Sequence, residues 1–150
     1  LEARGHGLAG FAATLGGSLE VTARDGQLIG YDLPAVQAAA SGPDFATVEP
    51  ALRGALAGGD GATAFERLEA RARVADGVAV LEHAAIGTER GGAAEAEGRI
   101  DLARGTLDVT ISTVPVADAP PIRLRLTGPA TAPRRQPELA PFLRWKAERG

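Results

Sequence analysis

Apolar and polar residues alternate with a period of two along most of the chain from residue 18 onward. Such alternation is typical of strands that bury one face and expose the other. In the first run, Leu19 and Val21 share a face until Asp25-Gly26 interrupts the pattern, which resumes over residues 27–31. Because Asp-Gly between two such runs favours a tight turn, we predict a hairpin that reverses at Gly26.

Two further hairpins follow the same rule. Residues 68–74 alternate as far as Asp76-Gly77, after which residues 78–86 return. Residues 94–102 alternate as far as Arg104-Gly105, after which residues 107–112 return. A type I′ turn needs positive φ at its central residues. We therefore expect positive φ at Gly26, Gly77 and Gly105.

A last strand over residues 122–126 brings the number of strands to about seven, in an antiparallel meander with one wetted face. The predicted fold class is mainly β (α+β), a sheet built from hairpins. One apolar row lines the inner face, as a groove or as a closed core, and comprises Leu19, Val21, Val74, Ile100, Leu102, Val109, Ile111, Leu124 and Leu126.

Two segments between the first and second hairpins break the alternation. Leu33 to Ala40 begins with a proline near a helix start, and Val48 to Ala57 has helical spacing and ends before Gly58-Gly59. We expect two short helices there, within an insertion over about residues 33–58, lying on the apolar face. A further short helix is expected over Glu138 to Glu148.

Three regions follow from these signals. Residues 1–17 form a Gly-rich lead-in, residues 18–128 a single β-rich domain, and residues 129–150 a Pro/Arg-rich tail that contains the terminal helix. The chain of 150 residues suits one domain. No run reaches the roughly 18 apolar residues of a membrane span, so any membrane anchor is expected outside this chain.

Composition narrows the classes of function. A net charge of −3 lacks the basic footprint of a nucleic-acid-binding protein. The absence of cysteine excludes disulfides, thiolate metal sites and a cysteine nucleophile. With four Phe, one Tyr and one Trp, the core must be built from aliphatic side chains.

Candidate catalytic groups are few. His83 falls on the same side as Leu81 if the alternation holds, which favours a packed histidine over a ligand. Glu95, Glu97 and Asp101 share a strand face with arginines, a pattern typical of solvated cross-strand charge pairs. No phosphate-binding loop or nucleophile motif is present. We predict no enzyme, no cofactor and no metal site. Two interpretations remain for the basic residues from Arg134 onward: an ordinary soluble tail, or a segment that contacts anionic lipid.

The order of four motif blocks resembles the C-terminal region of the AsmA family of Gram-negative envelope proteins, over roughly residues 8–137. The blocks read Leu19-x-Val21 leading to Asp25-Gly26-x-Leu28-x-Gly30-x-Asp32-Leu33; Thr63-x-Phe65-x-x-Leu68-x-Ala70-x-x-x-Val74-x-Asp76-Gly77; Gly98-x-Ile100-Asp101-Leu102 and Gly105-Thr106-Leu107-Asp108; and Pro121-Ile122-Arg123-Leu124-x-Leu126-x-Gly128-Pro129 with Pro133.

That resemblance implies a lipid-handling module on the periplasmic side of the inner membrane, involved in outer-membrane biogenesis and in phospholipid transport or homeostasis. The family is related to bridge-like lipid transfer proteins, whose β-grooves hold acyl chains. It implies a phospholipid or another acyl-chain lipid as ligand, with envelope proteins as further partners, and no catalytic residues. The alternative is a scaffolding or protein-interaction module whose apolar face is a closed core.

Overall fold

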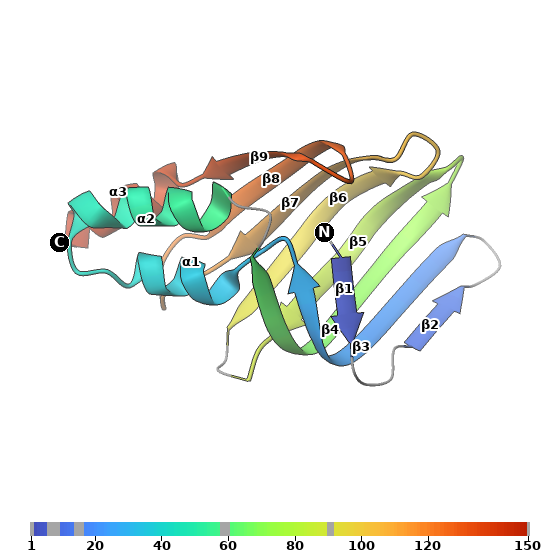
Figure 1. The fold of residues 1–150 in the computed structure, drawn as a ribbon, viewed down its shortest axis with the longest axis horizontal. Coiled ribbons are helices and arrows are strands. Elements are labelled where there is room, and N and C mark those ends of the chain that lie inside the picture. Colours follow the sequence, from blue (N-terminus) through green and yellow to red (C-terminus); the bar gives the residue numbers. More distant parts are fainter. Residues whose placement is uncertain (1, 6–9, 14–16, 58–60, 90–91, 150) are drawn as a thin grey trace.

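The computed structural model describes residues 2–5, 10–13, 17–57, 61–89 and 92–149. They form a nine-stranded antiparallel sheet and three helices (Figure 1). The strands are β1 (Glu2–Gly5), β2 (Gly10–Ala13), β3 (Ser18–Ile29), β4 (Ala62–Ala75), β5 (Val78–Gly87), β6 (Ala93–Asp101), β7 (Thr106–Thr113), β8 (Ile122–Pro129) and β9 (Arg134–Glu138). The helices are α1 (Leu33–Ala40), α2 (Phe45–Ala57) and α3 (Ala140–Arg149).

The predicted fold class is confirmed. Strands β3 to β9 pair in sequence order as a seven-stranded antiparallel meander, and β1 and β2 both pair with the free edge of β3. Helices α1 and α2 lie between β3 and β4 in the chain. All three helices gather at one end of the sheet, at the left of Figure 1, while the rest of the sheet curves away from them.

The hairpin predicted at Asp25-Gly26 is wrong, because β3 runs straight through these residues. β4 pairs with β3 in one register on both sides of them, from Arg24 opposite Arg67 to Gly26 opposite Phe65. Asp25 adopts the positive φ, 54°, and Gly26 does not. Aspartate tolerates this conformation better than most residues. The result is a local irregularity inside a strand rather than a reversal of the chain.

At this irregularity, β3 and β4 both change which of their alternate residues point to the inner face. On β3 the less exposed positions change from odd numbers, such as Ala23, to even numbers, such as Gly26. On β4 they change from Phe65 to Leu68, and the two residues between them are exposed. Because both strands shift together, the cross-strand register survives and the inner face stays continuous.

The other two predicted turns are confirmed. Asp76 and Gly77 have φ of 53° and 77°, as the central residues of a type I′ turn require. Gly105 has φ of 66° and ends the turn between β6 and β7.

Both inserted helices are present. Asp32 caps α1, since its carboxylate accepts a hydrogen bond from the Ala35 amide at 3.0 Å, and Pro34 occupies the first turn. Helix α2 begins at Phe45, three residues before the predicted start at Val48.

The regions expected as a lead-in and a tail both belong to the sheet. Residues 1–17 contribute β1 and β2, and residues 129–150 contribute β9 and α3. β9 pairs with β8 over residues that the sequence suggested were irregular. Leu139 and Phe142 are buried in the same core as α1 and α2. The C-terminal segment is therefore an integral part of the fold and not a free tail.

Candidate functional site

The inner face of the curved sheet is mostly apolar, and its polar side chains, Thr63, Thr113 and Arg135, lie at the end under the helices. Residues directly opposite each other on antiparallel strands point to the same face. Ala70 pairs with Val21 on β3 and Ala84 on β5, and Ala84 pairs with Ala96 on β6, which pairs with Ile111 on β7. The aliphatic rows predicted from the alternation therefore lie side by side on one surface.

Beyond the helices this surface encloses a hollow of about 390 Å³. Its wall is aliphatic and comes from five strands, β3 to β7, with Ala130 after β8. Its larger side chains are Leu28, Leu68, Leu81, Ile86, Ile100, Leu107, Val109 and Ile111. Glu69 and Glu95 border it from alternate positions that are exposed to solvent. The hollow thus offers apolar area and almost no hydrogen-bonding groups.

The predicted inner row divides into three groups. Ile100, Val109 and Ile111 line the hollow. Leu124 and Leu126 are fully buried under the helices, so they belong to the closed core.

The third group comprises Leu19, Val21 and Val74. These side chains are half-buried and share the face of the hollow without lining it, because they pair with Ala72, Ala70 and Ala79 on neighbouring strands.

The prediction for Leu102 is wrong. This residue was expected in the inner row, but β6 ends at Asp101 and Leu102 lies in the following turn with 58% of its surface exposed. The alternation extends one residue beyond the strand, because a turn residue is not bound by the pleat of the sheet.

Some residues that line the hollow are missing from the predicted row, for two different reasons. Leu68, Leu81 and Leu107 follow the same alternation as the row, so the signal for them was present. Leu28 could not be placed, because the expected reversal at Gly26 put it on a separate return strand.

One end of the inner face is closed by the helices. Arg135 of β9 donates hydrogen bonds to the carbonyls of Leu56 in α2 and Gly30 after β3, each at 2.8 Å. It therefore ties the last strand to the other side of the curved sheet. Tyr31 is 1% exposed beside it, and its hydroxyl has no hydrogen-bond partner among the residues that the structure describes. Burial raises the pKa of Tyr31 well above its usual value, and nearby Arg135 opposes that shift in part.

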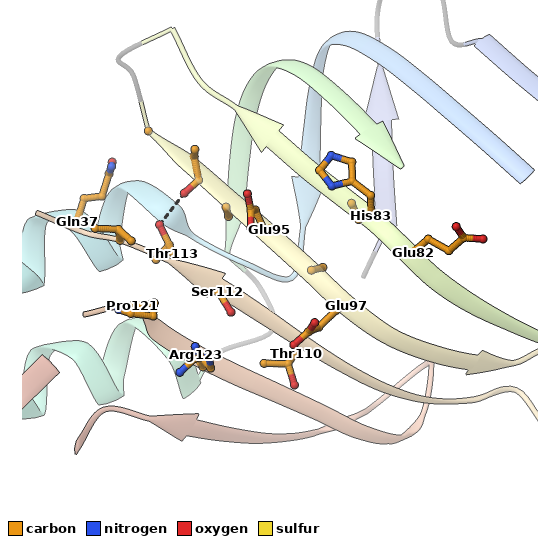
Figure 2. Close-up of a pocket in the computed structure, with 16 residues that line it drawn as sticks. Gln37, Glu82, His83, Glu95, Glu97, Thr110, Ser112, Thr113, Pro121 and Arg123 are labelled. Carbon is orange, nitrogen blue, oxygen red and sulfur yellow. Dashed lines mark hydrogen bonds between the residues drawn. The ribbon is translucent and has the colours of Figure 1, made fainter. Parts of the chain in front are cut away.

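A second hollow, of about 550 Å³, is polar (Figure 2). Its ionisable side chains are Glu82 and His83 from β5, Glu95 and Glu97 from β6, and Arg123 from β8. Figure 2 also shows the bond from the Thr113 hydroxyl to the Ala93 carbonyl, 2.6 Å long, at its border.

His83 does not lie on the side of Leu81 as the alternation predicted. The pairing of β5 shifts register beside Glu82, which is one extra residue in the strand. Such a bulge re-aims the side chains that follow it. Both Glu82 and His83 are exposed, and Glu82 forms an ion pair with Arg73 at 3.2 Å. This surface is a solvated field of mixed charges.

In the described part of the chain, no group of three or more His, Asp or Glu side chains is placed to hold a metal ion. None of the helices in these described ranges is long and apolar enough to cross a membrane. His6 lies outside the described residues. Comparisons with protein-family models, with curated proteins and with solved structures find no match to this chain. On its geometry alone, the candidate functional site is the aliphatic hollow.

Proposed function

We propose that the chain is a non-catalytic lipid-handling module whose aliphatic hollow holds the hydrocarbon chain of a lipid. One observation carries this proposal: beyond the helices, which cover only one end of the inner face, that face is lined almost entirely by aliphatic side chains. The remaining face is a concave wall of half-buried aliphatic side chains. Contiguous apolar surfaces of this kind mark ligand grooves or interaction sites.

The chemistry of the wall selects the class of ligand. A hydrocarbon chain needs apolar area and no hydrogen bonds, and burial contributes about 0.8 kcal/mol for each methylene. A ligand with polar groups along its length would lose its hydration in this hollow without replacement. We therefore expect an acyl chain inside and a headgroup that stays in water.

The resemblance to the AsmA family is consistent with this function and supplies its cellular setting. We propose a periplasmic location, beside the inner membrane, and a contribution to outer-membrane biogenesis through phospholipid transport or homeostasis. The scaffolding alternative requires that the apolar face be a closed core. It is disfavoured, because Ile100, Leu107 and Leu81 are only partly buried.

A pair of substitutions on one strand tests the hollow. Ala70 lines it and Ala64, on the same strand, is exposed to solvent. Ala70→Phe should fill the hollow and weaken the binding of a fluorescent fatty acid at least several-fold, whereas Ala64→Phe should bind like the wild type. Native mass spectrometry should find lipid on the wild-type protein and less on Ala70→Phe.

If the folded wild-type protein carries no lipid and binds no fatty-acid probe, the proposal fails and the scaffolding alternative is favoured. Equal probe binding by the two variants would also contradict it, because the ligand would then occupy another surface.

A further inference from the structure

Three large apolar side chains are exposed among the described residues: Leu102 (58%), Val114 (53%) and Val80 (48%). Val80 lies on a strand between Arg73 and Arg99, its cross-strand partners, in the field of mixed charges on the outer face. Val114 follows β7, whose C-terminal end lies toward the helices. Leu102 differs from both, because it lies in a turn at the end of the sheet opposite the helices (Figure 1).

The turns at that end form a continuous structure, which we call the distal rim: residues 76–77, 102–105 and 130–133. The Leu102 amide donates to the Gly77 carbonyl, and the Ala130 amide donates to the Gly105 carbonyl, each at 2.8 Å. Three successive turns are thus joined to one another by backbone hydrogen bonds. Leu102 projects from an ordered rim and not from an isolated loop.

The distal rim is continuous with the apolar hollow. Ala130 belongs to the rim and also lines the hollow, and Ile100 and Leu107 line it from the strand ends next to the rim. The opposite end is filled by the core beneath α1 to α3. The end of the hollow next to the rim is therefore the end that the helices do not cover.

Exposed guanidiniums lie at the rim and beside it. The Arg104 side chain is 83% exposed, and its guanidinium stands 4.0 Å from the Asp101 carboxylate, a long ion pair. Arg134 begins β9 beside the rim and is exposed. Within the rim the charges of Asp76 and Arg104 balance, and those of Asp101 and Arg134 beside it balance as well. An apolar side chain flanked by exposed guanidiniums can enter the interface while the cations meet headgroup phosphates.

We propose that the distal rim is a membrane-docking edge, with Leu102 inserted among phospholipid headgroups so that the hollow opens onto the bilayer. The partner is the surface of a phospholipid bilayer. This inference rests on the proposed function, because it assigns the hollow's opening to the place where a lipid chain leaves or rejoins a membrane.

Vesicle flotation with two matched variants tests the proposal. Liposomes of phosphatidylglycerol and phosphatidylethanolamine should bind the wild type, and Leu102→Ser should bind roughly tenfold more weakly, since a large aliphatic side chain is lost from the interface. Val114→Ser removes a side chain of similar exposure away from the rim and should bind like the wild type. Arg104→Ser with Arg134→Ser should also weaken binding.

Binding of the fluorescent fatty acid from solution separates this proposal from the function on which it rests. Leu102→Ser should keep that binding, because Leu102 does not line the hollow. Fatty-acid binding with no vesicle binding by the wild type, or equal vesicle binding by Leu102→Ser and Val114→Ser, would overturn the docking edge and leave the hollow's function standing. Vesicle binding that depends on Leu102 without any fatty-acid binding would support the edge and overturn the proposed function.

Discussion

The two ends of the apolar inner face of this protein differ in how deeply their side chains are buried. At the end under the helices, Ile122, Leu124 and Leu126 have no exposed surface. Farther along the same sheet, Ile100 and Leu107 are half-buried around the hollow. The strands carry the same alternating pattern at both ends, so the pattern makes an apolar face and the helices decide which part becomes core. Stability should therefore reside at the covered end and ligand binding at the open end.

The largest effect expected from this comparison is on the free energy of unfolding. Leu124→Ala leaves a cavity in a packed core and should destabilise the fold by about 2–5 kcal/mol. Ile100→Ala removes a side chain that already meets solvent, so it should cost less than half as much. Urea denaturation of both variants measures the difference. Similar losses would show that the open end is as tightly packed as the core.

The distal rim gives the next effect in size. Gly77 has φ of 77°, where a β-branched residue is strained, and Gly77→Val should destabilise the fold by about 1–3 kcal/mol. Gly87 on β5 is the control, because a Cβ added there meets nothing within 4 Å and its φ is not positive. Thermal unfolding should show a lower midpoint for Gly77→Val only. An unchanged midpoint would contradict the ordered turn on which the rim depends.

Tyr31 at the covered end gives a smaller effect, with a definite sign in pH. Its hydroxyl is buried without a partner in the described part of the chain, so Tyr31→Phe should stabilise the fold by about 1 kcal/mol at neutral pH. Burial raises its pKa above the ordinary value of 10.0. The folded chain then keeps a proton that the unfolded chain has lost, so stability is complete below pH 10 and falls as the pH rises further.

The chain has one tyrosine, which makes this measurement clean. Urea midpoints between pH 8 and pH 11 should fall more for the wild type than for Tyr31→Phe. Parallel curves would mean that the phenol ionises as easily in the folded chain as in the unfolded one, and that the covered end admits water.

Local signals allowed the correct parts of the fold to be predicted from the sequence. Pro34 after a capping aspartate marks the start of α1, and Asp76-Gly77 marks a tight turn, because each depends on the conformations that a few residues can adopt. Asp25-Gly26 carries the same dipeptide and forms no turn, because β4 and the two short strands flank β3 on both edges there. Long-range pairing overrides the turn preference at that position.

Four features of the fold and the site depend on contacts that a linear pattern does not contain. The bulge at Glu82 moves His83 to the outer face, and Leu102 leaves the sheet one residue after β6 ends. β9 lies in the segment expected as a Pro/Arg-rich tail, and its Pro137 is compatible with a strand at the edge of a sheet. Whether an apolar row is groove or core depends on where three helices pack, and alternation is identical in the two cases.

The smallest effect is expected on the outer face of the open end, at the pair of Asp108 and Arg125. The Arg125 guanidinium donates two hydrogen bonds to the Asp108 carboxylate, at 2.9 and 3.1 Å, across β7 and β8. These hydrogen bonds lower the pKa of Asp108, so the pair contributes stability above the usual carboxyl pKa and loses it as the pH falls through the lowered value. Both side chains are nearly half-exposed, and solvent screens such pairs strongly.

Asp108→Asn should therefore shift the urea midpoint only slightly at pH 7, and the difference from the wild type should shrink as the pH falls below the usual carboxyl pKa. Arg123→Ala with Arg125→Ala should likewise leave the fold intact and leave vesicle binding unchanged, since neither arginine belongs to the distal rim. A large loss of stability at pH 7 would mean that the outer face, and not the helix-covered end, holds the sheet together. Loss of vesicle binding in the double variant would move the membrane contact from the rim to this face.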